Sequence, residues 1–188
     1  MKKFMITLGI CAIFGILAAG SFSSDSNNSG GSTTASTTTN KEKEKEEKAK
    51  EFYLGDTVQA GKFSIAVLKP EVKPSVGSQY IKQEANGVYW IFPVAVRNDD
   101  TESRLVDTTM FQLISESGAK SNPDASAGML MDTSSLFLER INPGVQVDSY
   151  VIFDMPKDHK PETYKLAVRG GVGFKSTTPI EIILQEKK

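Results

Sequence analysis

Hydrophobic and polar residues alternate with a period of two along much of the chain after Phe52. The clearest stretch is Val88–Asn98, and alternate residues of a strand point to the same face. One predicted face is therefore wholly apolar: Val88, Trp90, Phe92, Val94 and Val96. The other face is nearly apolar too. This pattern predicts a covered central strand of a β-sandwich, with Trp90 in the core. Pro93 cannot donate to a ladder, so we expect a bulge or an unpaired side there.

Shorter alternating stretches separated by turn residues predict the other strands. The best turn signal is Asn142-Pro143-Gly144, where Pro suits position i+1 and Gly suits position i+2 of a type II turn. About eight short strands at regular spacing indicate a sandwich or a barrel. The expected strands are Thr57–Gln59, Phe63–Lys69, Val88–Asn98, Thr109–Glu116, Leu136–Ile141, Val145–Met155, Tyr164–Arg169 and Ile180–Leu184.

Two segments of the predicted domain lack this pattern. Pro74–Gly87 is interpreted as a long polar connection, with turn signals at Val76-Gly77 and Asn86-Gly87. Ser121–Ser135 is the least strand-like part, although Asn122-Pro123-Asp124 could cap a short helix. Long connections in compact domains often carry function. We therefore expect contact residues there, with Gln79, Tyr80, Asp124 and Met129 as candidates.

The first twenty residues have the layout of an export signal. Lys2 and Lys3 precede an uncharged run that ends in Ala18-Ala19-Gly20, which suits a signal-peptidase site. The run is also long enough to remain as an uncleaved membrane anchor. Leu17–Ser21 resembles a lipobox with Ser21 in place of the lipidated Cys, which excludes lipidation there. Residues 1–20 are thus predicted to be a signal peptide or an N-terminal membrane anchor.

Residues 21–51 have the composition of a spacer. Ser21–Asn40 is rich in Ser, Thr, Asn and Gly, which is typical of a disordered linker. Lys41–Glu51 is a charge run without an apolar stripe, predicted to be a solvated, partly helical stalk. Such a spacer would lift a domain off a membrane, or form the tail of a secreted protein. The composition changes at Phe52, so residues 52–188 are the predicted folded domain.

Composition excludes several classes of function. The formal net charge of −1 gives no sign of nucleic-acid binding. The single cysteine, Cys11, lies in the N-terminal apolar run, so the folded part has no disulfide, Cys-ligated metal or thiol nucleophile. His159 is the one histidine, which rules out a His-based triad or a multi-His metal site. We expect it in an exposed loop.

Other chemistry is weakly indicated. Asp99, Asp100 and Glu102 lie in one turn and could bind calcium, although their spacing matches no EF-hand loop. A solvated turn is the simpler interpretation. Gly170–Gly173 is glycine-rich but lacks a phosphate-loop Lys and a following helix, so we expect no nucleotide site. Tyr80 is a better surface aromatic than Trp90. No cofactor is predicted.

The order of these motifs resembles the telokin-like, immunoglobulin-like domain of unknown function found in exported lipoproteins of Gram-positive bacteria. The matching pieces are Tyr53–Val58, Val96-Arg97-Asn98, Phe111-Gln112-Leu113 with Ser117-Gly118, Asn142-Pro143-Gly144 and Val151–Pro156. The resemblance implies an immunoglobulin-like antiparallel β-sandwich without established catalytic residues. The missing lipobox Cys departs from the common pattern and removes the lipid anchor.

These observations support an exported cell-envelope protein with a non-catalytic interaction domain of unknown ligand. The predicted partner is an envelope protein or a surface ligand. No nucleic acid is expected, and membrane contact is expected only through the N-terminal segment. An accessory structural subunit of an envelope assembly is the alternative. An enzyme is less favoured, because nucleophile, base and metal ligands are missing as a set.

Overall fold

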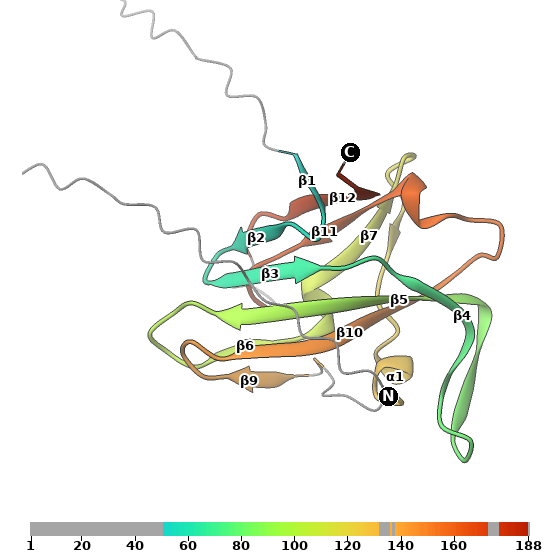
Figure 1. The fold of residues 1–188 in the computed structure, drawn as a ribbon, viewed down its shortest axis with the longest axis horizontal. Helices are drawn as coiled ribbons and strands as arrows, with labels where there is room; N and C mark the ends of the chain where they lie inside the picture. Colours follow the sequence, from blue (N-terminus) through green and yellow to red (C-terminus); the bar gives the residue numbers. More distant parts are fainter. Residues whose placement is uncertain (1–50, 132–135, 137, 173–176, 188) are drawn as a thin grey trace, which may run out of the picture. The chain divides into compact units, whose positions relative to one another are not determined.

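The computed structural model describes residues 51–131, 136, 138–172 and 177–187. They form a β-sandwich of two five-stranded sheets with a separate two-stranded sheet (Figure 1). The strands are β1 Phe52–Leu54, β2 Thr57–Ala60, β3 Phe63–Val67, β4 Glu71–Gly77, β5 Lys82–Asn98, β6 Arg104–Val106, β7 Phe111–Ser115, β8 Lys120–Ser121, β9 Glu139–Ile141, β10 Gln146–Met155, β11 Tyr164–Val168 and β12 Ile180–Glu186. Three short helices join them: η1 Thr108–Met110, α1 Ala125–Gly128 and η2 Pro161–Thr163.

The strand order confirms the predicted all-β sandwich. One sheet runs β1-β12-β11-β7-β8, and the other runs β10-β5-β3-β2 with β4 also paired to β5. All ladders are antiparallel except that of β1, which joins β12 in parallel. The small third sheet pairs β6 with β9. The predicted segments 1–20 and 21–50 lie outside the described residues, whereas the change of composition at Phe52 coincides with the start of β1.

The main core lies between the two large sheets. The apolar face of β5 faces it, and Trp90 and Phe92 are fully buried, as predicted. Phe92 packs edge-on against Phe153 of β10, and Trp90 packs edge-on against Tyr164 of β11 at 5.3 Å between ring centroids. Burying a large apolar side chain contributes roughly 1.5–3 kcal/mol, so this cluster dominates the stability of the domain.

A second apolar cluster covers the other face of β5. Tyr89 and Ile91 of β5 pack with Ile152 of β10, Val76 of β4 and Ala127 of α1. Strand β4 and helix α1 therefore cover this face of β5. The prediction that β5 is covered on both sides is confirmed, and the covering elements come from the two segments without a clear pattern.

The backbone irregularity expected at Pro93 is confirmed on the side of β3 and β4. Val67 faces Val94 and Glu71 faces Ile91, so three residues, 68–70, stand opposite two, 92 and 93. Leu68 donates its N–H to the Pro93 carbonyl at 2.9 Å. The extra residue interrupts the ladder where Pro93 has no N–H to give.

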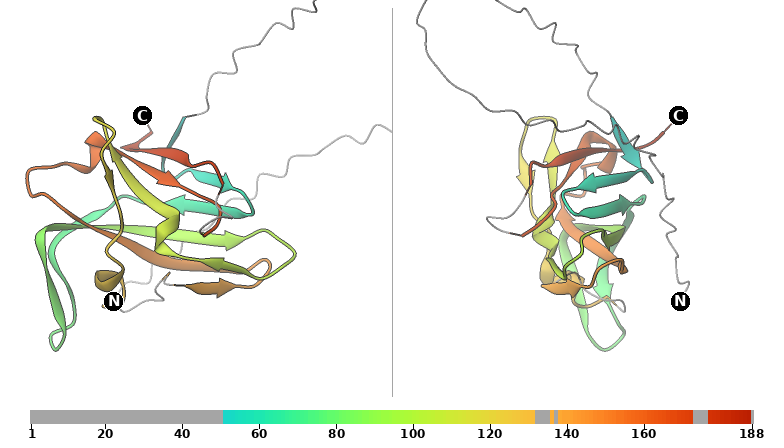
Figure 2. Two further views of the ribbon diagram at one scale, coloured as in Figure 1. Left: turned by 180° about the vertical axis from the view of Figure 1, so that it is seen from behind. Right: turned by 90° about the vertical axis from the view of Figure 1, so that its left-hand side faces the viewer.

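The interpretation of Pro74–Gly87 as a polar connection is wrong. Residues 75–77 pair with 82–84, and residues 71–73 pair with 89–91, so the segment is a β-hairpin that lengthens β5 to 17 residues. Both views of Figure 2 show this green hairpin extending past the other strands. The sequence pattern did not predict these strands, because a two-stranded ribbon buries few side chains and most of its residues are therefore polar. Asn86-Gly87 is not a turn but lies within β5. The register of the β4–β5 ladder shifts around it, because Lys73 stands opposite Tyr89 whereas Ser75 stands opposite Glu84.

The turn predicted at Asn142-Pro143-Gly144 is confirmed. Gly144 has φ +72°, as position i+2 of a type II turn requires, and its N–H donates to the Asn98 carbonyl at 2.8 Å. The buried Asn98 side chain donates to the carbonyls of Glu102 and Ile141. Asn98 and Gly144 therefore fix the turn end of β5 and β10.

Candidate interaction surface

The two segments expected to carry contacts meet in the fold. The Gln83 side chain of β5 donates to Asp124 at 3.1 Å and to Ser126 at 3.3 Å, both at the start of α1. We call residues 72–83 and 124–129 the hairpin corner. The chain separates these segments by some forty residues, so only the tertiary structure brings them together.

Asp124 is a positioning residue of this corner. Its carboxylate accepts the Ala127 N–H at 3.0 Å and the Ser126 hydroxyl at 2.6 Å, as an N-cap residue does. The helix that Asn122-Pro123-Asp124 was predicted to cap is α1. Because Asp124 also accepts from Gln83, its oxygens are occupied within the fold. It holds α1 against the hairpin, and its part in binding stays a prediction.

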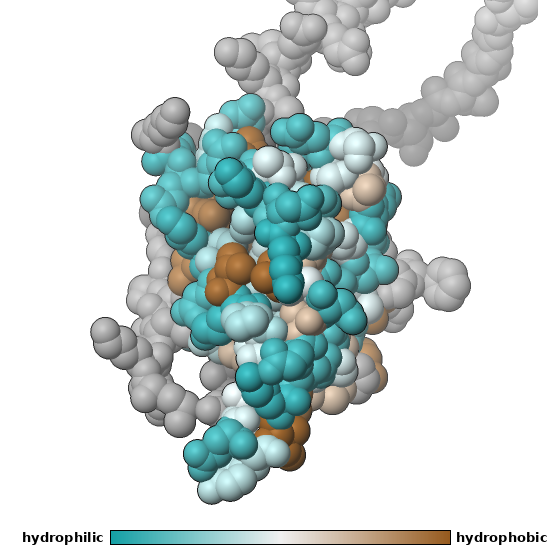
Figure 3. Space-filling view, turned by 90° about the vertical axis from the view of Figure 1, so that its right-hand side faces the viewer, coloured by the Kyte–Doolittle hydropathy of each residue, from teal (hydrophilic) through white to brown (hydrophobic). Residues whose placement is uncertain are grey.

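The hairpin corner concentrates exposed apolar side chains. Tyr80 is 87% exposed, Ile81 64%, Val72 54% and Met129 52%, whereas Leu138 and Val145 are the other large exposed apolar residues of the described part. Gln79 is exposed beside Tyr80 at the tip. Figure 3 shows this side of the molecule as largely hydrophilic, with apolar atoms beside the projecting end of the hairpin. Grouped apolar exposure of this kind is typical of contact surfaces.

Sequence reasoning identified part of this surface. It predicted Gln79, Tyr80 and Met129, and the structure exposes all three. It missed Ile81 and Val72. Ile81 follows Tyr80 directly, and an apolar pair inside a polar segment is the signal that could have identified it. Val72 could not be found, because its exposure depends on the free side of β4.

A carboxylate fixes the base of the hairpin. Asp154 of β10 accepts from the Asn86 N–H at 2.8 Å, from the Asn86 side chain at 2.7 Å and from the Gly87 N–H at 3.0 Å. Burial acts to raise the pKa of Asp154, but the donors of Gly87 and Asn86 outweigh it and the pKa is lowered. Gly87 must be glycine, since a Cβ there would lie 2.1 Å from the Met155 carbonyl oxygen. The hairpin is thus held at a defined angle to the sandwich.

The outer edge of β4 is protected against pairing with another strand. In the described part β4 pairs only with β5. The backbone groups of Pro93 point toward β3 and β4, and those of every second residue of β5 do the same. Trp90 falls between these residues, so it forms no backbone hydrogen bond with β4. Its partner Val72 therefore directs its own N–H and carbonyl away from β5, toward the free edge. Pro70 and Pro74 flank it and have no N–H. Prolines guard sheet edges in this way, so this edge offers few backbone donors to another strand.

The acidic turn is occupied by internal partners. Asp99 accepts from Arg97 at 2.6 Å, from Ser64 at 2.5 Å and from Gln59. Burial acts to raise the pKa of Asp99, but these donors lower it. Asp100 pairs with Arg104, and the Thr101 N–H, with that arginine, lowers the pKa of Asp100. Glu102 is exposed. No group of three or more His, Cys, Asp or Glu side chains that could hold a metal occurs among the described residues.

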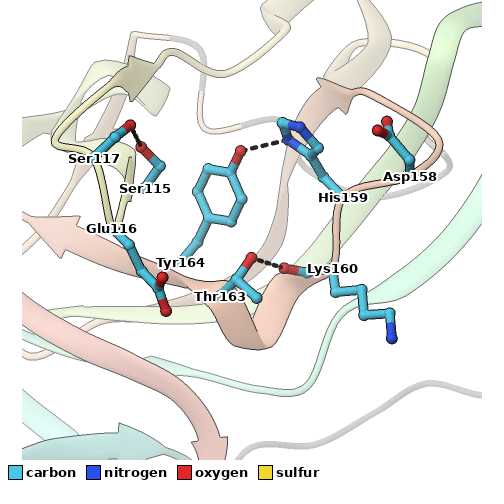
Figure 4. Close-up of a pocket in the computed structure, with 8 residues that line it drawn as sticks. All are labelled: Ser115, Glu116, Ser117, Asp158, His159, Lys160, Thr163 and Tyr164. Atoms are coloured by element: carbon cyan, nitrogen blue, oxygen red, sulfur yellow. Dashed lines mark hydrogen bonds between the residues drawn. The ribbon is translucent and has the colours of Figure 1, made fainter.

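A polar hollow of about 320 Å³ lies at another part of the domain. It is lined by the turn after β7 and by the connection from β10 to β11 (Figure 4). His159 is in an exposed loop there, as predicted, and its Nδ1 lies 2.6 Å from the Tyr164 hydroxyl. Burial, with a smaller effect of Asp158, raises the pKa of Tyr164. The remaining lining residues are Ser115, Glu116, Ser117, Lys160 and Thr163.

Comparison with known proteins finds relatives whose functions are not described. Residues 52–180 match the family model "Domain of unknown function (DUF4352)". The chain is similar to the uncharacterized protein YxkC of Bacillus subtilis, with 26% identity over 129 residues that cover 64% of this chain and 72% of YxkC.

Two solved structures share the fold. The yjhA protein of Bacillus subtilis aligns with a TM-score of 0.53 at 17% identity, over 71% of this chain and 99% of its own. A conserved hypothetical protein of Bacillus anthracis aligns with a TM-score of 0.50 at 20% identity, over 63% and 89% respectively. Within the described ranges, no helix has the length and hydrophobicity needed to cross a membrane.

Proposed function

This chain belongs to the domain family of unknown function DUF4352, and from that premise we propose that it is an exported, non-catalytic interaction domain of the cell envelope. The contact surface is the hairpin corner. A protein of the envelope is the partner that this surface fits best. The finer resemblance, to telokin-like domains of exported lipoproteins, is part of this proposal.

The observation that carries the proposal is the grouping of exposed apolar residues on a rigid projection. Tyr80 and Ile81 stand at the hairpin tip, and Met129 is the C-cap residue of α1, the helix whose start contacts Gln83 of the hairpin. Aromatic residues and Met are enriched at the centres of protein interfaces. The Asp154 and Gln83 contacts hold the projection in place before a partner arrives. Such pre-organisation lowers the entropy cost of binding.

Several features support a non-catalytic role. The one histidine is bonded to a tyrosine hydroxyl and has no carboxylate or nucleophile as a hydrogen-bond partner in the described part. The acids of the 98–103 turn serve as ion-pair and turn partners. The side chains of residues 78–81 at the hairpin tip are uncharged, and a surface of hydroxyl, amide, aromatic and aliphatic groups suits contact.

Export is inferred from the N-terminal sequence. Two lysines followed by an uncharged apolar run and small residues are the parts of a signal segment. The Ser/Thr-rich and charged residues after it would separate the domain from a membrane surface. A mature protein beginning near Ser21 would support cleavage. An intact N-terminus on the exported protein would support the anchor.

The test is site-specific photo-crosslinking in the native host. A photoreactive phenylalanine analogue replaces Tyr80 in the full-length chain, and the same analogue at Val145 is the matched control, because Val145 is exposed and apolar but lies at the opposite end of β5. We expect one discrete protein adduct from position 80 and none from position 145. Ile81→Ser should abolish the adduct while changing the free energy of unfolding by less than about 0.5 kcal/mol. The same adduct from both positions, or none from either, would contradict the proposal.

A further inference from the structure

The polar hollow is a second concave feature of the domain, separate from the hairpin corner. Tyr164 of β11 stands opposite Ser115 of β7 in the ladder, so their side chains lie on the same face of the sheet. Tyr164 is buried at the floor, and its hydroxyl is held by His159 from the opposite wall. Figure 4 shows these side chains converging from two elements that are distant in sequence.

Both walls of the hollow are fixed by local hydrogen bonds. On one side, the Ser115 and Ser117 hydroxyls lie 2.8 Å apart, and Ser115 also accepts the Ala119 N–H. On the other side, the Thr163 hydroxyl donates to the Lys160 carbonyl at 2.8 Å. The loop between β10 and β11 and the turn after β7 therefore present their polar groups in a set arrangement.

The lining combines hydroxyls with free acceptors. Ser115, Ser117, Thr163 and Tyr164 supply four hydroxyl groups. Glu116 and Asp158 line the same hollow, and neither accepts a hydrogen bond or forms an ion pair within the described residues. Lys160 is the only fixed positive charge of the lining, and Figure 4 shows its side chain directed away from Tyr164. This field repels anions, and the mixed polar and apolar walls suit a ligand that carries both kinds of surface.

We propose that this hollow binds a neutral, polyhydroxylated ligand of sugar size, such as one residue of a glycan. Sugar hydroxyls both donate and accept, so they can donate to Glu116 while they accept from the serine hydroxyls. The volume of about 320 Å³ is at the small end of ligand pockets. The exposed imidazole of His159, oriented by Tyr164, forms a flat wall for the sugar ring.

The fold provides a spectroscopic reporter for this site. Trp90 is the one tryptophan of the chain, and its ring lies edge-on to Tyr164 at 5.3 Å. A ligand that contacts Tyr164 or His159 changes the surroundings of a residue packed directly on the tryptophan. The Trp90 emission therefore responds to the pocket; because Val72 of the hairpin corner pairs with Trp90 in the ladder, a second readout at the pocket residues is needed to assign the response.

The experiment titrates the full-length chain with N-acetylglucosamine, with its β-1,4-linked tetramer and with the acyclic polyol sorbitol, and follows Trp90 emission. We expect a saturable change with sugar and none with sorbitol. Tighter binding of the tetramer than of the monomer would identify a glycan chain as the source, whereas equal binding would identify a free sugar or a chain end. Glu116→Gln should weaken sugar binding about tenfold.

Glu102→Gln is the matched control, because it removes an exposed carboxylate at the far end of β5. It should leave the titration unchanged. Amide chemical shifts of Ser117 and His159 provide a second readout that does not depend on the fluorophore. The proposal is overturned if neither readout responds to sugar at high millimolar concentration, if sorbitol gives the same response, or if both glutamate variants behave alike.

Discussion

The two halves of β5 belong to one continuous strand but depend on different forces. Residues 88–98 lie inside the five-stranded sheet with apolar layers on both faces, and most of them are buried. Residues 82–87 pair with β4 alone, and exposed and half-buried side chains alternate along them. The inner half is held mainly by burial of apolar surface, whereas the outer half is held by hydrogen bonds to Asp154 and Asp124 and by the packing of Val76 and Ala85 in the smaller apolar cluster.

This difference shows how a projecting surface can be built on a small apolar cluster. An isolated two-stranded hairpin is marginal in water. Here a long strand anchored in the sandwich continues outward, and two carboxylates from other elements fix its base. The tip is then free to expose apolar residues, because the stability of the fold does not depend on them.

Truncation of the inner half should have the largest effect. Phe92→Ala removes a fully buried ring that packs edge-on against Phe153, and we expect a loss of about 3–5 kcal/mol in the free energy of unfolding. Tyr80→Ala in the hairpin is the matched aromatic control and should change it by less than about 0.5 kcal/mol. Denaturant unfolding of both variants measures the two changes in the free energy of unfolding. Similar losses for both would contradict the claim that the two halves of β5 contribute differently to stability.

Substitution at the junction of the two halves should have an intermediate effect. Gly87→Ala places a Cβ against the Met155 carbonyl, so the strands must separate, and we expect a loss of about 1–3 kcal/mol. Gly128→Ala in α1 is the control, because it meets nothing within 4 Å. It should stabilise the protein by about 0.5–1 kcal/mol. Melting temperatures that move in the same direction for both variants would contradict this account of Gly87.

Loss of the Asp154 carboxylate should have the smallest effect, and one that depends on pH. Asp154→Asn should cost about 1 kcal/mol at pH 7, because the amide accepts less strongly from Asn86 and Gly87. The pKa of Asp154 is lowered in the fold from its ordinary value of 3.8. The contribution is therefore complete above about pH 4 and is lost as pH falls through the folded-state pKa.

The measurement is the difference in unfolding free energy between the wild-type chain and Asp154→Asn from pH 7 to pH 2. That difference should shrink only at the acidic end. Asp158→Asn is the control, since this exposed carboxylate accepts no hydrogen bond in the described part. A difference for Asp154→Asn that stays constant with pH would show that the carboxylate charge does not hold the hairpin.

The sequence predicted those strands whose side chains are buried, because burial requires a regular apolar pattern. Trp90, Phe92 and the rest of the apolar face of β5 alternate strictly, so their strand and its place in the core were evident. Residues 75–77 and 82–84 pair in a ribbon that needs few apolar side chains, so their strands left no periodic signal. The exposed tip was predicted from the polarity of its segment, and its partner α1 was predicted from its capping residues. Their contact through Gln83 had no sequence signal at all.

The sequence by itself determined the β-sandwich class, the core strand, the Pro-Gly turn after β9 and the lack of a thiol or multi-histidine site, because these depend on local pattern and on residue inventory. Only the tertiary structure decided that two pattern-free segments form one corner, that Asp154 fixes it, and that His159 meets Tyr164 over a polar hollow. Those pairings join residues far apart in the chain. Each pairing rests on a few local contacts between two segments. The two segments meet only after the apolar core has fixed the register of the strands.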